Sequence, residues 1–224
     1  MIIPNQTESP IVVEPIKTPA RILAIANQKG GVGKTTTAVN LGTALAAVGE
    51  KVLLIDLDPQ GNASTGLGID RRDRGVGTYH VVIEGVDAKS AVLPTTIPNL
   101  SVISSSVDLS GAELELVELP NREHRLREAI RQISDSYSYI LIDCPPALGL
   151  LTLNAFSAAD AVLVPLQCEF YALEGLSHLV RTIERVKRAF NPRLEIQGLV
   201  LTMFDKRNSL CDLVASDVRQ HFGD

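Results

Sequence analysis

A glycine-rich turn between an apolar run and a helical pattern places the strongest constraint on this 224-residue chain. The run Ile22–Ala26 leads into Asn27-Gln28-Lys29-Gly30-Gly31-Val32-Gly33-Lys34-Thr35-Thr36, and a helix is predicted directly afterwards. Glycines let a backbone turn tightly and direct successive N–H groups at one anion, and the start of a helix adds the positive end of its dipole. Lys34 can then reach the β- and γ-phosphates, and the Thr35 hydroxyl can ligate Mg²⁺. The segment therefore predicts a phosphate-binding loop for ATP and Mg²⁺.

This loop departs from the standard pattern G-x-x-x-x-G-K-[ST], because Gln28 occupies the position of the first glycine. It also carries a second lysine, Lys29. A second cation beside a triphosphate adds positive charge where charge develops during phosphoryl transfer. Since Lys34 already occupies the reach of its own loop, Lys29 could point outward to the nucleotide of a second subunit. A solvated lysine on an exposed turn fits the residues equally well, so the chemistry alone leaves both alternatives open.

From residue 20 onward, apolar runs alternate with helical patterns, as is typical of an α/β fold with a parallel sheet. The predicted strands are Arg21–Ala26, Val52–Asp56, Leu100–Ser104, Tyr139–Asp143, Ala161–Pro165 and Ile196–Thr202. The predicted helices are Thr35–Val48, 122–135, 150–158, 171–190 and 209–222. The order predicts a P-loop NTPase fold, a mostly parallel twisted sheet with helices on both faces.

The chain is predicted to form one domain preceded by a short arm. Residues 1–19 place four prolines among polar residues and are predicted to be a flexible N-terminal arm. Residues 20–224 are predicted to form the P-loop ATPase domain. A sheet of this kind normally continues with another strand and a closing helix, so we expect the C-terminal end of the domain to be incomplete at Asp224.

Aspartates stand where two predicted strands end. Asp56 ends one strand and Asp58 follows two residues later, which puts both on one face of an extended chain; Asp143 ends another strand. Ligands of open α/β sheets bind at the carboxyl ends of strands, and phosphoryl transfer needs carboxylates that hold hydrated Mg²⁺ and orient water. Aspartates at strand ends can also simply cap turns or helices. We predict that Asp58 positions the attacking water, that Asp58 and Asp143 bind Mg²⁺ through water, and that Asp56 could serve either role.

The composition narrows the classes of function. A formal net charge of −5 argues against a surface coated in basic residues, and an aromatic content of 4% argues against a stacking platform for single-stranded nucleic acid. The cysteines, Cys144, Cys168 and Cys211, have the spacing of neither a metal site nor a disulfide framework, which favours the reducing cytoplasm. No apolar stretch reaches the roughly 18 residues of a membrane helix, and no secretory signal is visible.

Five segments in the same order resemble the ParA/Soj partition ATPases, deviant-Walker proteins that segregate bacterial chromosomes and plasmids. The segments are Lys29–Thr36, Asp56–Asn62, Asp143–Pro146, Tyr171–Leu176 and Leu201–Asp205. The resemblance implies a weak ATPase whose Mg-ATP form is a sandwich homodimer, with Lys29 crossing to the phosphates of the partner. It also implies that Asp58 is the hydrolytic aspartate, that the loop residues Gly30 to Thr36 bind nucleotide, and that Met203 and Asp205 lie near the adenine. The short arm resembles chromosomal members more than plasmid members.

The same resemblance implies two macromolecular partners. The ATP-bound dimer is expected to bind double-stranded DNA without sequence preference, and a ParB-type centromere-binding protein is expected to stimulate hydrolysis and release it. A cytoplasmic, nucleoid-associated protein follows from this. The DNA-contacting arginine of the family matches Arg207. From the residues alone, Arg181, Arg185 and Arg188 form one stripe of a helix that could be a phosphate-binding patch or a solvated face.

The main alternative is a membrane-associated positioning ATPase of the MinD type. Such a protein would need an amphipathic basic helix near its C-terminus, and none is recognised in this sequence. An electron-transfer ATPase like the nitrogenase iron protein would need cysteine ligands for a shared cluster, a pattern that Cys144 and Cys168 do not form. A metabolic kinase with the same loop is a further alternative, but no acceptor-binding residues stand out.

Overall fold

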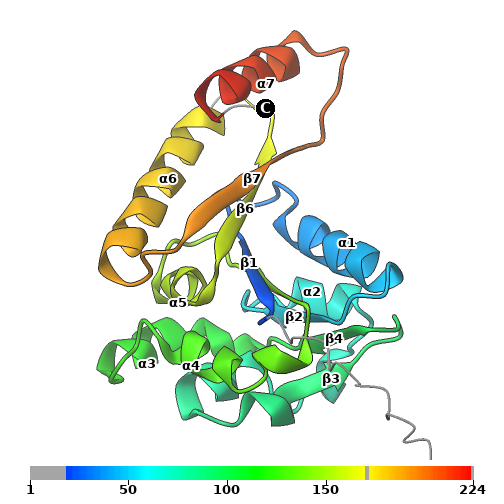
Figure 1. Ribbon diagram of the computed structural model, residues 1–224, viewed down its shortest axis with the longest axis vertical. Helices are drawn as coiled ribbons and strands as arrows, with labels where there is room; N and C mark the ends of the chain where they lie inside the picture. The colour runs from blue at the N-terminus through cyan, green and yellow to red at the C-terminus, as the bar shows by residue number, and fades with distance from the viewer. Residues whose placement is uncertain (1–18, 170–171, 223–224) are drawn as a thin grey trace, which may run out of the picture.

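The computed structural model describes residues 19–169 and 172–222 and forms one seven-stranded sheet in the order β3-β4-β2-β5-β1-β6-β7 (Figure 1). All neighbouring strands are parallel except β3, which runs antiparallel to β4. The mostly parallel α/β fold predicted from the sequence is confirmed. Residues 1–18 of the predicted arm, Tyr171 of the quoted motif and Asp224 lie outside the described residues.

The elements have the following bounds. The strands are β1 (Arg21–Ile25), β2 (Val52–Asp56), β3 (Val92–Pro94), β4 (Leu100–Ile103), β5 (Tyr139–Asp143), β6 (Ala161–Gln167) and β7 (Glu195–Thr202). The α-helices are α1 (Lys34–Ala47), α2 (Asn62–Gly66), α3 (Ala112–Glu118), α4 (Arg125–Arg131), α5 (Leu150–Ala158), α6 (Ala172–Ala189) and α7 (Ser209–Phe222). Short helical turns of 3₁₀ or π type occupy Arg71–Asp73, His80–Glu84, Ala88–Ala91, Val107–Ser110 and Ser134–Ser136.

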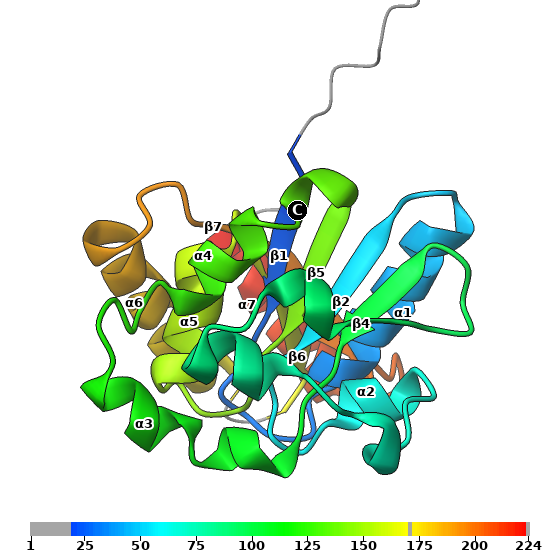
Figure 2. The same ribbon diagram turned by 90° about the horizontal axis from the view of Figure 1, so that it is seen from below.

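Helices cover both faces of the sheet, as Figure 2 shows. Residues of α1 and α2 pack with one face in a smaller apolar cluster, and residues of α3 to α7 pack with the other face in a larger one. Strand β2 is buried along its whole length, so its continuous apolar run agrees with a strand covered on both sides. Among the described residues, no helix combines the length and apolarity needed to cross a bilayer.

The strand register brings the predicted aspartates together. In the parallel ladders, Asp143 of β5 is the direct partner of both Ile25 in β1 and Asp56 in β2. The chain leaves β1 into the glycine-rich loop one residue after Ile25. The loop and the aspartates therefore meet at the carboxyl end of the central strands, as the alternation of strands and helices predicts.

The predicted helix 122–135 is too long, since α4 spans only Arg125–Arg131. The side chain of Asn154, from α5, accepts a hydrogen bond from the backbone N–H of Leu126 at 3.1 Å and donates to the carbonyl of Arg122 at 2.6 Å. This tertiary contact stands in for a local cap and sets where the helix begins. The short elements β3, α2 and α3 were not predicted, because they are too brief to show a clear period.

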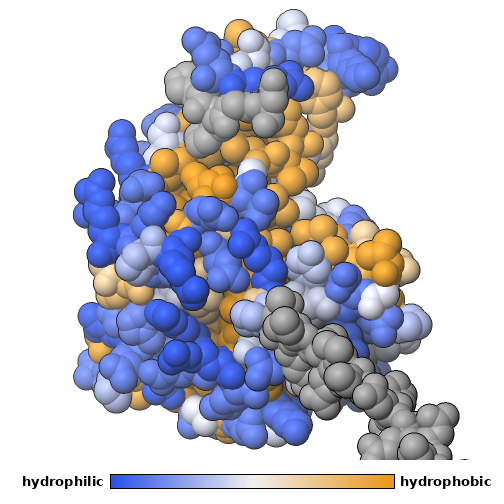
Figure 3. Space-filling model, viewed as in Figure 1, coloured by the Kyte–Doolittle hydropathy of each residue, from blue (hydrophilic) through white to orange (hydrophobic). Residues whose placement is uncertain are grey.

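The predicted strand Ala161–Pro165 is too short, since β6 continues to Gln167. Pro165 lacks a backbone N–H, but β1 pairs with β6 only as far as Leu163. No ladder hydrogen bond on that side is therefore lost. On its other side β6 pairs with β7, whose residues are mostly half-buried, and Figure 3 shows apolar side chains at the surface over β7. Strand β7 is the least covered of the parallel strands.

Asn191 offers a test of what holds the α6–β7 turn to the core. Its buried side-chain amide donates to the carbonyls of Phe156 at 2.9 Å and Ala159 at 2.7 Å. We expect Asn191→Ala to lower the free energy of unfolding in urea by about 2 kcal/mol, because both buried carbonyls lose their donor. The exposed Asn40→Ala in α1 is the control, with an expected change within about 0.5 kcal/mol. Equal effects of the two changes would contradict this role.

Candidate functional site

The glycine-rich loop closes around the ammonium of Lys34. Gly31 and Gly33 adopt φ angles of 75° and 88°, in the left-handed region that other residues rarely enter. Lys34 begins α1, and its Nζ donates to the carbonyl of Lys29 at 3.0 Å across the loop. The first backbone N–H groups of α1 have no partner within the helix, so this end of the helix is suited to an anion.

Side chains from outside the loop fix its position over the sheet. The buried amide of Asn27 donates to the carbonyl of Pro165 in β6 at 2.7 Å, and its oxygen accepts from the N–H of Lys29 at 3.0 Å. The hydroxyl of Thr202, at the end of β7, donates to the carbonyl of Val32 at 2.8 Å. The loop is therefore tied to two strands before any ligand binds, which is the preorganisation that phosphate binding needs.

A cavity of about 250 Å³ lies against the loop at the carboxyl end of the sheet. It joins the loop to the segments that follow β2, β5 and β7. The predicted residues that line it are Gly30, Gly31, Gly33, Lys34, Thr35, Thr36, Asp58 and Met203. Residues without a predicted role also line it, namely Gln60, Asn62 and Pro146. The structure thus brings most of the predicted nucleotide site into one concave surface.

Other predicted residues lie outside this lining. Val32 is buried beneath the loop, and Asp143 is buried beneath the cavity floor. Lys29 points to solvent and forms an ion pair with Glu169 of the same chain. Asp205 is paired with Arg207, whose side chain is 89% exposed.

Lys34 is a buried cation at the centre of the site. Burial lowers the pKa of its ammonium, whereas the charges of Asp143 and Asp58 raise it. Asp58 is itself buried, and its Oδ1 accepts a hydrogen bond from the N–H of Gln60 at 2.9 Å. The site therefore holds a lysine and two carboxylates in a region of little water, where their interactions are stronger than at the surface.

Asp56 is engaged in holding the backbone next to the site. Its Oδ2 accepts from the N–H and the hydroxyl of Ser64 in α2 at 2.8 and 2.6 Å, and its Oδ1 accepts from the N–H of Asp58 at 3.3 Å. Burial raises the pKa of Asp56 to about 6, and the hydrogen bonds from Ser64 oppose that shift. Of the two roles open from the sequence, these contacts favour neither; they assign Asp56 the positioning of α2 and of Asp58.

Asp143 differs from Asp56 because its carboxylate has no regular partner. Both oxygens are buried without a hydrogen bond to any described residue. Burial raises the pKa of Asp143 to about 7; the neighbouring Thr35 hydroxyl lowers it, although it does not reach regular hydrogen-bond geometry. An unpartnered buried carboxylate is costly unless a cation or a water shell satisfies it. Hydrated Mg²⁺ held by the Thr35 hydroxyl would fit this position.

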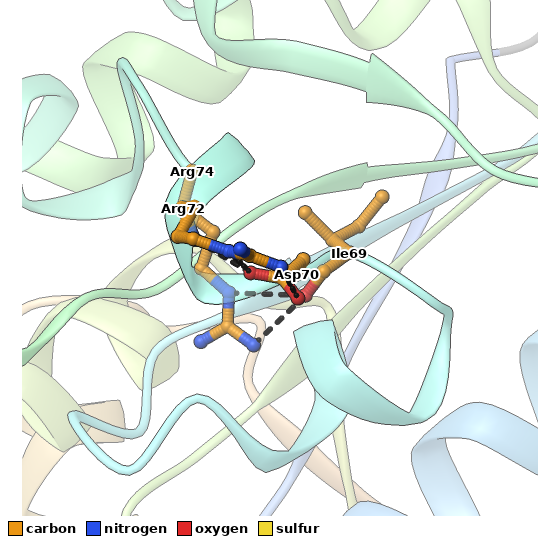
Figure 4. Close-up of polar contacts among 4 residues, drawn as sticks. All are labelled: Ile69, Asp70, Arg72 and Arg74. Carbon is orange, nitrogen blue, oxygen red and sulfur yellow. Dashed lines mark hydrogen bonds and ion pairs between the residues drawn. The ribbon is translucent and has the colours of Figure 1, made fainter.

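Arg74 links α2 to the segment after β4, and Figure 4 shows its contact with the carbonyl of Ile69. Its guanidinium donates to the carbonyl of Ile69, to the carbonyl of Ser105 at 3.1 Å and to the hydroxyl of Thr65 at 2.7 Å. Gly61 has a φ of 64°, and a Cβ there would lie 2.2 Å from the Arg74 Nη1. Asp56 therefore holds Asp58 and the start of α2, and Arg74 holds the end of α2 and the residues that follow it.

Several residues of the site received no role from the sequence alone. Gln60, Asn62 and Pro146 lie within segments that resemble the ParA/Soj family, so their place in those segments could have identified them as site residues. The contacts of Asn27 with Pro165 and of Lys29 with Glu169 join residues about 140 positions apart, so no local sequence pattern predicts them.

The unpartnered Asp143 generates a pH dependence of stability. Its pKa of about 7 in the folded chain lies above the ordinary value of 3.8, so the folded state holds this proton more tightly than the unfolded state. Its contribution to stability is full below about pH 4 and is lost as the pH rises through about 7. Compared with Asp143→Asn, which cannot titrate, the metal-free wild type should therefore lose free energy of unfolding between about pH 4 and about pH 7. Urea unfolding of both proteins measures this, and a difference independent of pH would contradict it.

Comparisons with known proteins agree with this site. A family model described as an AAA domain matches residues 20–196. The chromosome partitioning protein ParA of Caulobacter vibrioides is 62% identical over 208 residues, which cover 92% of this chain and 78% of that protein. The sporulation initiation inhibitor protein Soj of Bacillus subtilis is 50% identical over 204 residues, which cover 91% of this chain and 81% of that protein.

Solved structures share the fold as well. A structure of cobyrinic acid a,c-diamide synthase from Mycobacterium smegmatis with bound ADP and magnesium has a TM-score of 0.86 and 40% identity, covering 91% of this chain and 82% of that one. A plasmid partition protein from Borrelia burgdorferi has a TM-score of 0.78 and 27% identity, covering 90% of this chain and 86% of that one. With its P-loop, its parallel sheet and these relatives, the chain belongs to the ParA/Soj family of chromosome-partitioning ATPases.

Proposed function

We propose that this chain is an ATP-dependent switch for DNA partition. Binding of Mg-ATP drives the formation of a sandwich dimer, the dimer binds DNA without sequence preference, and slow hydrolysis releases it. One observation carries the proposal. The phosphate loop, Lys34 and Asp58 line the same cavity, and the buried carboxylate of Asp143 has no hydrogen-bond partner among the described residues. Relatives named as chromosome partitioning proteins support it.

The residues of the cavity suit a magnesium nucleotide. Among the described residues, no cluster of histidine, cysteine, aspartate and glutamate could hold a metal by itself, which agrees with an ion bound jointly by protein, water and phosphates. In the proposed site, Thr35 would ligate the ion, and Asp58 and Asp143 would bind it through water. Such an ion would supply positive charge to the phosphates. The relative solved with ADP and magnesium supports this assignment by likeness.

Asp58 is the proposed hydrolytic residue. It lines the cavity, whereas the carboxylate of Asp56 is occupied by Ser64 and the N–H of Asp58. With one oxygen held by the N–H of Gln60, the Asp58 carboxylate has a fixed orientation in which it can accept a proton from water. Lys34 beside it supplies positive charge to the phosphates.

Lys29 is the proposed contact with the second subunit. Its side chain is 46% exposed and is paired with the side chain of Glu169, which is 38% exposed. An exposed ion pair of this kind contributes less than about 1 kcal/mol, so phosphates on a partner chain can replace Glu169 at little cost. Hydrogen bonds between charged groups and phosphate are stronger than this pair, which favours the dimer once ATP is bound.

DNA binding is assigned to Arg207, together with the exposed stripe of α6 that contains Arg181, Arg185 and Arg188. Contacts from arginine to phosphate are independent of sequence and weaken with salt. A ParB-type centromere-binding protein is the proposed partner that accelerates hydrolysis, and the nucleoid is the proposed place of action. Both follow from the likeness to relatives named ParA and Soj.

Two alternatives are less well supported. A MinD-like positioning ATPase that binds membranes would share the loop and the dimer, but relatives at 62% and 53% identity are named chromosome partitioning proteins. An amide-forming enzyme is suggested by the name of one structural relative, which is 40% identical. Relatives named as partition proteins reach 62% and 53% identity over a similar share of this chain, and this difference favours partition.

Asp58→Ala tests the hydrolytic role. We expect the variant to bind Mg-ATP with unchanged affinity while its steady-state hydrolysis falls about 100-fold or more, because the proton acceptor for water is gone. Fluorescence titration and phosphate release measure the two properties. The exposed Asp73→Ala serves as the control and should hydrolyse ATP like the wild type. Wild-type turnover by Asp58→Ala would place the role on another residue.

Binding to duplex DNA with ATP, ADP or no nucleotide tests the function itself. We expect retention only with ATP, decreasing steeply between about 50 and about 300 mM salt. Arg207→Glu should weaken this retention about tenfold or more while ATP binding stays unchanged.

Arg72→Glu is a closely matched control for Arg207→Glu. Arg72 is also 89% exposed and is paired with an aspartate two residues earlier, Asp70, as Figure 4 shows. It should leave DNA retention unchanged. If ATP made no difference to DNA binding, the partition switch would be wrong; if both variants lost DNA equally, only the assignment to Arg207 would be wrong.

A further inference from the structure

A second cavity, of about 460 Å³, opens at the amino end of β1. Its walls come from the first residues of β1, from α4 and from the turns before β6 and β7. Figure 2 shows α4 beside this end of β1. The five residues of β1 separate it from the phosphate loop, which corresponds to about 16 Å of strand. It is therefore distinct from the nucleotide site at the opposite end of the same strand.

Arginines dominate the lining of this cavity. Arg127 and Arg131 stand four residues apart on α4 and so share one face of the helix, and Arg193 comes from the turn before β7. None of these three guanidinium groups makes an ion pair or a hydrogen bond with another described residue. They form a cationic cluster whose donors are available to a ligand.

The remaining charges at the cavity do not neutralise this cluster. Arg21 is held by Glu195 at 2.8 Å and by Gln197 at 3.0 Å. Asp160 is the acidic residue among the described residues that line the cavity, and its Oδ2 accepts from the N–H of Ile22 at 2.8 Å. The cavity therefore combines one carboxylate, which has a structural hydrogen bond, with three arginines that have no partner among the described residues.

We propose that this cavity binds a compact small molecule that carries several phosphate groups. Guanidinium groups present planar pairs of donors that match phosphate oxygens, and three of them suit a ligand with more charge than a single carboxylate has. The volume lies in the range of small-molecule sites, and Ile22 and Ile130 add apolar wall that excludes water. A concave site of this size fits a compact anion better than the long convex backbone of duplex DNA.

The test uses the full chain with its phosphate loop saturated by Mg and a fluorescent ADP analogue, and tripolyphosphate as the probe. Calorimetry should detect one further binding event, while the fluorescence shows that the ADP analogue stays bound. Arg127→Gln/Arg131→Gln should weaken this event about tenfold or more, because two charge-assisted contacts are lost. The control, Arg71→Gln/Arg72→Gln, removes two exposed arginines outside the cavity and should bind like the wild type.

Several results would overturn the proposal. The first is that tripolyphosphate shows no second binding event with the wild type. The second is that both double variants weaken its binding equally. The third is that the ADP analogue is released at the midpoint of the titration. A duplex of about 20 base pairs, titrated in parallel, separates the two sources of phosphate. If the α4 variant lost duplex DNA but kept tripolyphosphate, the cavity would be part of a DNA surface. Arg193→Gln, on a turn, repeats the test should the double variant fail to fold, and binding unchanged in it would also contradict the proposal.

Discussion

The structure depends on keeping one cation and two carboxylates buried together at the end of a parallel sheet. Lys34 loses hydration through burial, and the charges of Asp143 and Asp58 restore part of its stability as an ammonium. Asp143 in turn has no hydrogen-bond partner among the described residues. The charges of Lys34, Asp58 and Asp143 are thus only partly compensated within the protein. A magnesium nucleotide, which brings both phosphate anions and a cation, is suited to such a site.

Hydrogen bonds connect this charge cluster to the surrounding fold. Asp58 is linked through Asp56 and Ser64 to α2, and Arg74 ties that helix to Ser105 in the segment after β4. Thr202 links the phosphate loop to β7, and the segment after β7 carries Met203 and Arg207. One hydrogen bond and the backbone of residues 202–207 therefore connect the phosphate loop to the proposed DNA-binding side chain. On the opposite side, Lys29 is held by a weak exposed pair that a second chain can replace.

Much of this architecture could be predicted from the sequence because it is encoded locally. The glycines of the loop, the apolar runs and the terminal aspartates each carry their own signal, and the order of strands and helices then fixes the edge where they meet. The six parallel strands were placed to within about two residues, as expected when buried parallel strands form continuous apolar runs, whereas the antiparallel β3 was not predicted.

What could not be predicted depends on contacts between distant parts of the chain. The start of α4 is set by Asn154, and β6 passes Pro165 because β1 has already ended. The division of roles between Asp56 and Asp143 follows from Ser64, which reaches only Asp56. The arginine cavity gathers residues from four separate segments, so no single window of sequence reveals it.

We propose that a second copy of the chain contacts the phosphates of the ATP that the first copy holds. Sedimentation velocity with Mg²⁺ and a non-hydrolysable ATP analogue tests this claim most directly. The wild type should be a dimer with the ATP analogue and a monomer with Mg-ADP. Lys29→Gln should stay monomeric with the analogue, because its contact with the phosphates of the partner is lost. The exposed Lys89→Gln should dimerise like the wild type. A wild type that remains monomeric, or a Lys29→Gln variant that dimerises as well as the wild type, would contradict the account.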